Sequence, residues 1–319
     1  MTWVTWRQQR LEALLGGAVL ALIALFLLKT GLDLAAAFRS TGLAACLAQS
    51  TPAPTCPLSL DAFRQRAIPF EYPLYQGLIF LPLLIGLLLG APFVLELEQG
   101  TYRLAWTQSI TRTRWVLVKV GLLVGAAALA GAALAAVTTW WWGPINRIDT
   151  RLDRNPFELI GVVPVAYTIF AVALCLAAGT LLRRTIPAVG ATLVGFMALR
   201  IWIQTNLRYN YLPPFTKTFP VGTPYGLAQF GLQQVDYIVS LKGTVPPAVV
   251  MACMQANPGV PPDRPPVQAC LAQHGAMQLL VYQTADRFWP FQGIESAIFL
   301  GLAAALLALT VWWVRRRVA

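Results

Sequence analysis

Charge is scarce in this sequence. Only 12% of the 319 residues are charged, whereas 57% are hydrophobic, and the mean hydropathy is +0.61. Soluble domains carry roughly 25% charged residues, and a water-soluble fold of this length has too small an interior for so many apolar side chains. Lipid can replace a protein core as the apolar solvent. The composition therefore excludes an ordinary soluble domain and predicts a membrane protein.

The usual motifs of catalysis are also missing. No G-x-x-x-x-G-K-[ST] sequence occurs, so this chain has no P-loop with which to bind ATP phosphates. The single histidine, His274, gives almost nothing for a histidine-based metal site or a Ser-His-Asp triad. We therefore predict no catalytic residues, no metal and no cofactor on this chain.

Basic residues exceed acidic ones, with a formal net charge of +11. They stand in short clusters beside apolar runs, such as Arg183-Arg184 and Arg315-Arg316-Arg317. This placement is typical of membrane topology signals and differs from a continuous phosphate-binding face. We expect no nucleic acid partner.

Six apolar stretches are long enough to cross a membrane, because a helix needs about 20 apolar residues to span about 30 Å of hydrocarbon. Only three residues separate the fourth stretch from the fifth, which predicts a tight helical hairpin. The first is interpreted as an uncleaved span, since it outlasts the apolar part of a usual signal peptide. We expect an all-α polytopic protein with spans at roughly 13–35, 74–95, 116–140, 159–182, 186–206 and 291–314.

Arginine and lysine set the predicted orientation. With an even number of spans both termini share one side, where basic residues are dense and close to the span ends. The opposite side has slightly more basic residues, spread over the far longer segments 36–73, 141–158 and 207–290. Both termini are therefore predicted to be cytoplasmic. The basic residues on their side are Arg7, Arg10, Arg103, Arg112, Arg114, Lys119, Arg183, Arg184 and Arg315 to Arg317.

Four of the five cysteines fall in segments predicted to lie outside the cell. Cys46 and Cys56 follow the first span, and Cys253 and Cys270 lie between the fifth and sixth. Because disulfides form in oxidising compartments, we expect two of them. Proximity in sequence favours pairing within each segment, and Cys175 is interpreted as a packing residue inside a span.

The external segment 207–290 is rich in proline, glutamine and tyrosine. Short helices are expected at 247–256 and 266–284, with the prolines of 261–266 as a hinge between them. A Cys253–Cys270 bridge would join those two helices. We therefore expect an extracellular helical cap.

The segment between the second and third spans, residues 96–115, has an amphipathic pattern. Leu97, Thr101, Leu104 and Ala105 can share one helix face, after two acids and before several arginines. Gly100 loosens the start of this pattern, and Ser109 or Thr111 can cap the next helix. The pattern is typical of a helix that a cytoplasmic motor grips, although an ordinary solvated loop between two spans would look similar.

Here the sequence resembles a family. The run FVLELEQGTYRLAWTQSITRTRWVLVK is similar to the E-x-E-x-G-T … W-T-Q-S-x-T-R-x-R-W … K signature of bacterial ABC type-2 permeases. The runs TWRQQR and DRFWPFQGIE also resemble that group. The resemblance implies a permease of the type V exporter architecture in the bacterial cell membrane, which moves a hydrophobic or amphipathic cargo outward.

The resemblance also implies partners and a domain order. A separate P-loop ABC ATPase supplies ATP and magnesium, and a second permease copy makes a homo- or heterodimer among membrane lipids. Residues 1–12, with Trp3, Trp6, Arg7 and Arg10, would form an amphipathic connecting helix. Spans one to five occupy 13–206, the cap 207–290, and the sixth span and cytoplasmic tail 291–319. The implied ATPase-coupling residues are Glu96, Glu98, Gly100, Thr101, Arg103, Trp106, Thr107, Gln108 and Ser109.

Two small-residue pairs suggest close helix contacts, Gly86-x-x-x-Gly90 and Gly121-x-x-x-Gly125. Either pair can serve dimerisation or packing within one protomer, and the sequence alone favours neither.

Other functions remain open from the residues. An ion-coupled transporter needs a titratable group at mid-membrane, and the polar residues of the spans lie toward their ends, where snorkelling or helix-end ion pairs explain them better than a substrate vestibule. These residues are Lys29, Asp33, Arg200, Gln204 and Glu295. A lipid-modifying enzyme would draw on Glu71, Asp149, Asp153 or His274, and a partner-binding membrane protein would use the cap.

Overall fold

The computed structural model describes residues 2–47, 56–102, 111–147, 151–152, 154–220, 240–241, 247–259, 265–275 and 277–317. Six helices in these ranges are long and apolar enough to cross a membrane, which confirms an all-α polytopic membrane protein. The candidate spans are Ala21–Ser40, Leu81–Gln99, Arg112–Trp141, Val163–Leu182, Thr185–Asn210 and Phe288–Arg316.

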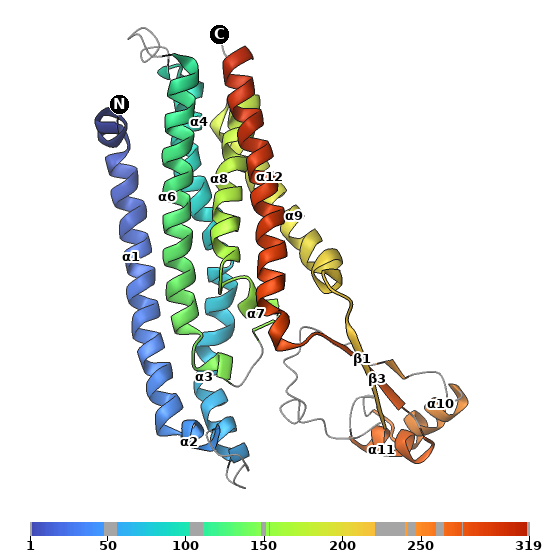
Figure 1. The fold of residues 1–319 in the computed structure, drawn as a ribbon. Helices are drawn as coiled ribbons and strands as arrows, with labels where there is room; N and C mark the ends of the chain where they lie inside the picture. Colours follow the sequence, from blue (N-terminus) through green and yellow to red (C-terminus); the bar gives the residue numbers. More distant parts are fainter. Residues whose placement is uncertain are drawn as a thin grey trace. The chain divides into compact units, whose positions relative to one another are not determined.

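The chain divides into two compact units. The first unit comprises residues 1–148, 155–203 and 292–319, and it contains the helical bundle (Figure 1). Its helices are α1 (Thr2–Ser40), α2 (Leu43–Leu47), α3 (Cys56–Leu78), α4 (Leu81–Gln99), α6 (Arg112–Trp141), α8 (Val163–Leu182), α9 (Thr185–Trp202) and most of α12 (Phe288–Arg317). The short η1 (Ile145–Arg147) follows α6, and α7 (Arg154–Phe157) precedes α8.

Helix α8 lies at the centre of the bundle and packs against α4, α6 and α9. Glycines allow the close approach of α4 and α8. A Cβ atom at Gly86 would lie 2.3 Å from the Cβ of Ala171, and one at Gly179 would lie 2.2 Å from a methyl group of Val94. Close backbone packing of this kind is a main source of helix association where no hydrophobic effect operates between helices.

Several helix ends follow from local sequence. The predicted hairpin of α8 and α9 is confirmed, with Arg183 in the left-handed conformation (φ +52°) at the turn. The expected span 74–95 is divided, because α3 ends at Leu78 and α4 begins at Leu81 with Pro82 in its first turn. Proline fits there because the first turn of a helix has no internal acceptor for its N–H groups.

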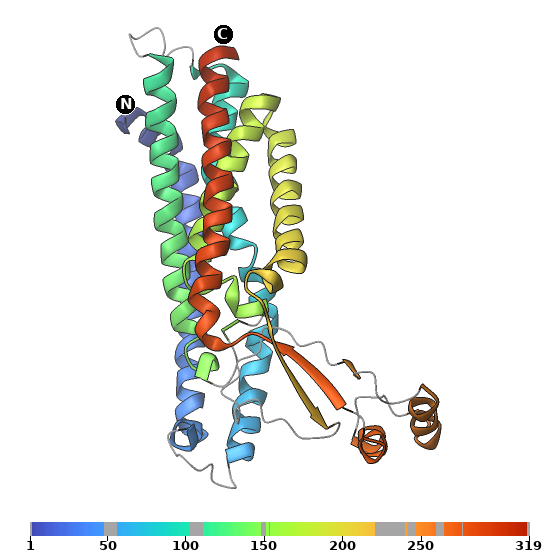
Figure 2. The same ribbon diagram turned by 45° about the vertical axis from the view of Figure 1, so that its right-hand side comes forward.

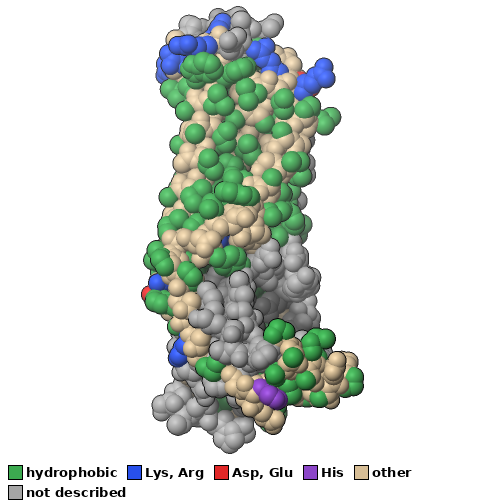
Figure 3. Space-filling model, turned by 90° about the vertical axis from the view of Figure 1, so that its right-hand side faces the viewer, with side chains coloured by type: hydrophobic (Ala, Val, Ile, Leu, Met, Phe, Trp, Pro, Cys, Tyr) green, Lys and Arg blue, Asp and Glu red, His purple; other side chains and the backbone are tan. Residues whose placement is uncertain are grey.

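Both chain ends described by the structure lie at the same end of the bundle (Figures 1 and 2). In Figure 3 the flank of the bundle is covered by hydrophobic side chains, and lysine and arginine side chains gather at the end that carries the termini. An apolar flank of this length is what a hydrocarbon environment requires. The multi-pass arrangement with an even span count is therefore confirmed.

The second unit comprises residues 149–154 and 204–291. A three-stranded antiparallel sheet in the order β1-β3-β2 is formed by β1 (Phe215–Pro220), β2 (Ser240–Leu241) and β3 (Met277–Tyr282). Two helices, α10 (Pro247–Ala256) and α11 (Pro265–Gln273), complete its main elements. Three short helical turns also occur near the ends of this unit: η2 (Ile203–Leu207), η3 (Arg208–Asn210) and η5 (Ala285–Arg287).

The sheet corrects one prediction from the sequence. A helix was expected over 266–284, but the helix ends at Gln273, with Gly275 in a left-handed conformation (φ +73°), and residues 277–282 form a strand. Strand β3 pairs with β1 from Phe215↔Tyr282 to Pro220↔Met277. A partner some sixty residues away overrode the local helical preference, as tertiary context often does for short apolar runs. The helix expected at 247–256 is confirmed as α10.

Candidate coupling end and buried polar cluster

The two glutamates of the predicted coupling segment belong to the last turns of α4. Gly100 ends this helix in a left-handed conformation (φ +70°), for which glycine carries no steric penalty. The Thr101 hydroxyl donates to the backbone carbonyl of Glu96, at 3.5 Å. Gly100 was expected to loosen the start of a coupling helix, and the structure instead makes it the terminus of the second span.

Glu96 is held inside the molecule by Lys119 of α6. The Lys119 ammonium forms an ion pair with the Glu96 carboxylate, and both side chains are largely buried. The same ammonium lies 4.9 Å from the centre of the Trp115 ring, within cation–π range. Glu96 therefore joins α4 to α6.

Glu98 makes the equivalent connection to α9. Its carboxylate accepts hydrogen bonds from the backbone N–H of Thr185, at 2.8 Å, and from the Thr185 hydroxyl, at 2.5 Å. The residue in the N-cap position of α9, Arg184, provides no side-chain cap. A carboxylate from another helix thus satisfies a free N–H group at the positive end of α9. Glu98 fastens the end of α4 to the hairpin of α8 and α9.

Trp115 is almost fully buried at this end of the bundle, with only 2% of its surface exposed, and residues from several helices pack around it. Its ring stacks on Phe93 with centroids 5.6 Å apart, and Tyr102 lies 6.3 Å away. The cluster around Trp115 extends to α8 and, through Val314, to α12. Tyr102 and Thr111 are the described residues on either side of 103–110. Tyr102 packs near the Trp115 ring, and the backbone carbonyl of Thr111 accepts a hydrogen bond from the Trp115 N–H at 3.0 Å.

Only part of the predicted coupling segment lies within the described residues. Thr111 caps α6, because its hydroxyl accepts a hydrogen bond from the N–H of Arg114 at 3.3 Å, which confirms one of the two predicted caps. The remaining predicted coupling residues lie outside the described residues. They are Arg103, Trp106, Thr107, Gln108 and Ser109.

A second group of polar residues is buried inside the bundle, and we call it the polar cluster: Glu158, Tyr167, Arg200, Gln292 and Glu295. The Arg200 guanidinium forms an ion pair with Glu158, and both side chains are almost fully buried. It also donates to the carbonyl of Ile79, at 2.6 Å, and lies 5.3 Å from the centre of the Tyr167 ring. Of the two readings expected for Arg200, snorkelling or an ion pair near the helix end, the structure supports the ion pair, and the side chain lies buried beside Glu158.

The polar cluster continues onto α12. The Tyr167 hydroxyl donates to the carboxylate of Glu295, which is fully buried. The Gln292 side chain accepts from the N–H groups of Val162 and Val163, at 2.9 Å each, and donates to the carbonyl of Phe157, at 2.7 Å. Gln292 thereby satisfies backbone groups that the start of α8 leaves free. Sequence reasoning missed Glu158, Tyr167 and Gln292, since no local pattern links residues up to 135 positions apart.

The small-residue pairs have different surroundings. Gly86 and Gly90 pack within the protomer, where Cβ atoms would meet Ala171 and Cys175 at 2.3 and 2.8 Å. Gly121 and Gly125 have no neighbouring atom within 4 Å of such a Cβ among the described residues, and both are exposed on α6. The structure thus assigns the first pair to internal packing and leaves the second pair on an open face.

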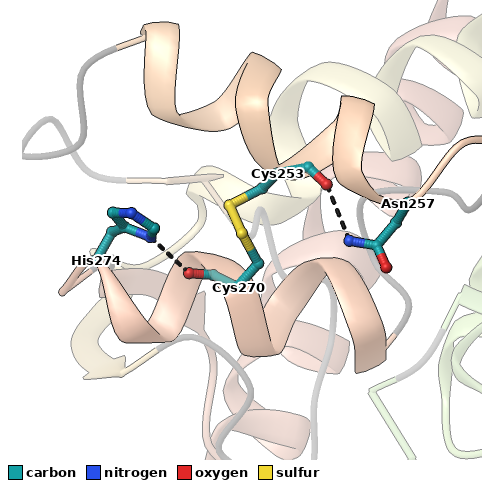
Figure 4. The surroundings of a disulfide bond; sticks show 4 residues. All are labelled: Cys253, Asn257, Cys270 and His274. Carbon is teal, nitrogen blue, oxygen red and sulfur yellow. Dashed lines mark hydrogen bonds between the residues drawn. A yellow bond between two sulfur atoms is a disulfide. The ribbon is translucent and has the colours of Figure 1, made fainter.

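The structure pairs the cysteines within each segment. Cys46 is bonded to Cys56 and Cys253 to Cys270, each pair with Cα atoms 5.7 Å apart, within the usual range for disulfides. Figure 4 shows the second bridge between α10 and α11, where His274 Nδ1 lies 2.9 Å from the Cys270 carbonyl oxygen. Cys253, Cys270 and His274 are close enough together to ligate a metal ion. However, neither sulfur is free to bind as a thiolate while the disulfide persists.

Of the four residues considered for a lipid-modifying enzyme, only His274 has a described side chain. Asp149 and Asp153 lie outside the described residues, as does the side chain of Glu71. His274 is exposed in the second unit.

Most of the bundle matches a known protein family. Residues 17–208, more than half of the chain, match the family described as ABC-2 membrane transporter related. The chain belongs to this family. No curated protein and no solved structure matches the chain.

The matched region contains the residues that meet at the candidate coupling end, whereas Val314 and the other α12 residues in the cluster around Trp115 follow it. The residues of this end are Glu96, Glu98, Trp115, Lys119 and Thr185. The matched region also contains Glu158, Tyr167 and Arg200, whereas Gln292, Glu295 and the three strands of the second unit follow it. This chain is therefore a multi-pass membrane protein of an ABC-2 transport family, and most of its second unit lies outside the matched region.

Proposed function

We propose that this chain is the permease subunit of an ATP-driven exporter, powered by a separate P-loop ATPase that binds ATP and magnesium. Membership of the ABC-2 family supports a transport role. The observation that carries the proposal is that Tyr102 and Thr111, which flank segment 103–110, both attach to the buried Trp115, Tyr102 through a ring contact and Thr111 through a backbone hydrogen bond.

That attachment suggests how force would travel. Trp115 packs in one cluster with Val172 and Leu176 of α8 and Val314 of α12. A close-packed interior is stiff and transmits displacement. When the ATPase closes on ATP and pushes the segment, α4, α6, α8 and α12 would move together. The permease then acts through different affinities of two conformations for cargo and for the states of the ATPase.

Glu96 and Glu98 have a supporting part in this proposal. Their carboxylates bind Lys119 and Thr185 within the chain. They would keep the end of α4 rigid, so that a push on segment 103–110 reaches the bundle. Thr101, Arg103, Trp106, Thr107, Gln108 and Ser109 are then the proposed contacts for the ATPase.

Orientation and cargo belong to the same proposal. The arginines at the terminal end of the bundle favour a cytoplasmic location for that end, by the positive-inside rule. The second unit would then be an extracellular cap with oxidised cysteines, in a bacterial cell membrane. A hydrophobic or amphipathic cargo would leave on that side.

A second permease copy would complete the transporter. The open face at Gly121 and Gly125 of α6 suits a close helix contact with another copy. Either an identical chain or a paralogue can supply that face.

Co-purification tests the proposal. The tagged chain is extracted from its native host in mild detergent, and the proteins that accompany it are identified by mass spectrometry. We expect a P-loop ATPase in stoichiometric amount, lost when residues 104–109 are replaced by a Gly-Ser segment of equal length. Intact, folded chain without any ATPase would reject the proposal.

One observation favours a second candidate, an ion-coupled transporter. Glu295 is a fully buried carboxylate inside the sixth candidate span, where ionisable groups usually have functional roles. Transport that is abolished by a protonophore and by Glu295→Gln, but resists vanadate, would support this candidate. The opposite pattern is expected for the exporter.

A further inference from the structure

A groove lies between the last turns of α1 and the turn that follows α6. Its volume is about 440 Å³, and it belongs entirely to the first unit. It lies at the end of the candidate spans Ala21–Ser40 and Arg112–Trp141, opposite the chain termini. Its lining residues are Gly31, Leu32, Ala35, Phe38, Arg39, Trp140, Gly143, Pro144 and Arg147.

The charges in this groove have one sign. Arg39 and Arg147 both line it, and no acidic residue does. Within the described part of the chain neither arginine forms an ion pair with a carboxylate. Asp33 belongs to a separate groove on another side of α1, which it shares with Arg66. Two guanidinium groups without a carboxylate are complementary to an anion, and phosphate is the anion whose geometry arginine matches best.

The Arg147 side chain is exposed, and one face of its guanidinium lies against an aromatic ring. The guanidinium lies 5.4 Å from the centre of the Phe38 ring, and that buried ring contacts Phe63 of α3 edge-on at 5.5 Å. The turn before it is closed by hydrogen bonds from the N–H of Gly143 to Trp140 O and of Asn146 to Trp142 O, at 3.1 and 2.9 Å. A pre-positioned cation loses less entropy when it binds a ligand.

The two walls of the groove are also fixed against each other. A Cβ atom at Gly31 would lie 2.5 Å from the ring of Trp140, so only glycine allows this approach of α1 to α6. The Trp141 indole N–H donates to the Thr30 hydroxyl at 3.0 Å, across the same contact. The contact between α1 and α6 beside the groove is therefore fixed by helix packing.

An apolar stripe leads from the groove toward the middle of the span. Leu25, Leu28 and Leu32 are 62%, 48% and 55% exposed. With Ala35 and Arg39 they follow the 3–4–3–4 spacing that places residues on one helix face. Trp140, which is 45% exposed, stands beside the stripe at the level where indoles mark the membrane interface.

A cationic groove at the membrane interface, continued by an apolar stripe, suits a ligand that has an anionic headgroup and an apolar tail. We propose that this groove binds a phospholipid, with the headgroup phosphate between Arg39 and Arg147 and an acyl chain along Leu32, Leu28 and Leu25. The site is distinct from the coupling end, lies at the opposite end of the bundle and does not depend on the exporter proposal.

Binding can be measured on the full-length, delipidated chain in mild detergent. The probe is dihexanoylphosphatidylglycerol below its micellar concentration, and the readout is the thermal unfolding midpoint as a function of probe concentration, because a ligand of the native state stabilises it. We expect a saturable rise. Arg39→Gln with Arg147→Gln should raise the apparent Kd by about tenfold or more, since two charge-assisted hydrogen-bonding groups are lost. The matched control Arg66→Gln should leave the Kd within about twofold.

A steric variant makes the test independent of charge. Ala35→Trp fills the groove and should abolish the saturable rise, whereas Ala36→Trp, its neighbour on the other groove, should retain it. An unchanged Kd in both Ala35→Trp and the double arginine variant would overturn the proposal.

Two further probes identify the ligand. Dihexanoylglycerol, which has the acyl chains without phosphate, should give no arginine-dependent shift, and an equal shift would reject the phosphate site. If inorganic phosphate alone saturated the site at the same concentration with the same dependence on the two arginines, the ligand would be free phosphate and the lipid assignment would be wrong.

Discussion

Among single residues, Arg200 and Glu158 form a buried ion pair whose disruption should lower the free energy of unfolding. Their side chains are 4% and 1% exposed, and the Arg200 guanidinium also donates to Ile79 O. Removal of one partner from a buried ion pair leaves an uncompensated charge, which typically costs about 3–5 kcal/mol. We expect Glu158→Ala to lower the free energy of unfolding by about 3 kcal/mol or more, measured by thermal or SDS-induced unfolding in detergent.

The double variant is the control for this prediction. Glu158→Gln combined with Arg200→Gln removes both charges together and should recover part of the lost stability. A single Glu158→Ala variant as stable as the wild type would show that the ion pair does not contribute this much to the free energy of unfolding. Arg66→Gln, which removes only an exposed hydrogen bond to Ser40, should stay close to the wild type.

Glu98 offers a test of internal anchoring against direct ATPase contact. Its carboxylate binds Thr185, so Glu98→Gln and Thr185→Val should lower the unfolding midpoint and ATPase stimulation in the same direction. The double variant should add little to either effect, because residues that act through one contact are not additive. Loss of stimulation in Glu98→Gln alone, with Thr185→Val unaffected, would instead indicate that Glu98 touches the ATPase.

Among the helices, the packing of α4 on α8 depends on glycine. A larger side chain at Gly86 meets Ala171 and the α8 backbone at 3.0 Å. We expect Gly86→Leu to destabilise the folded chain by at least about 1–3 kcal/mol, the usual cost of overpacking. Gly190→Leu at an exposed position of α9, where no described atom lies within 4 Å of the added Cβ, is the matched control, and its unfolding midpoint should not fall. Equal losses at the two positions would contradict the assignment of Gly86 to internal packing.

The open face of α6 at Gly121 and Gly125 gives a prediction for assembly. If a second copy packs there, Gly121→Leu with Gly125→Leu should lower the dimer fraction in native mass spectrometry or light scattering, while the monomer stays folded. An unchanged dimer fraction would show that the interface between copies lies elsewhere on the bundle.

Sequence periodicity and length were enough to predict the six spans, the α8–α9 hairpin and the Thr111 cap. These features depend on local signals, such as an apolar run, a pair of arginines or a threonine before a helix. The strand at 277–282 was missed because its partner β1 lies about sixty residues away. Glu158 was missed as the partner of Arg200 for the same reason, since the two residues are 42 positions apart and nothing local indicates which way an arginine near a span end turns.

For the whole molecule, orientation can be tested with the existing disulfides. Cys270 is on the predicted outer side, and Arg316 lies at the end that carries the termini. In intact cells treated with a mild reductant, a membrane-impermeant maleimide should label Cys270. Cysteine introduced as Arg316→Cys, in a chain whose other cysteines are replaced by serine, should react only after permeabilisation. The reverse pattern would place both termini outside.

The most direct test of an ATPase-driven permease is a contact measured at the segment between α4 and α6. A photo-crosslinking amino acid is placed at Trp106 or Gln108 in native membranes, with the exposed Ser40 at the opposite end of the bundle as the control position. We expect a crosslinked product with a P-loop ATPase from Trp106 or Gln108 that changes in yield with ATP and vanadate, and none from Ser40. A chain that is folded and abundant but gives no ATPase product at either position would contradict the proposed function.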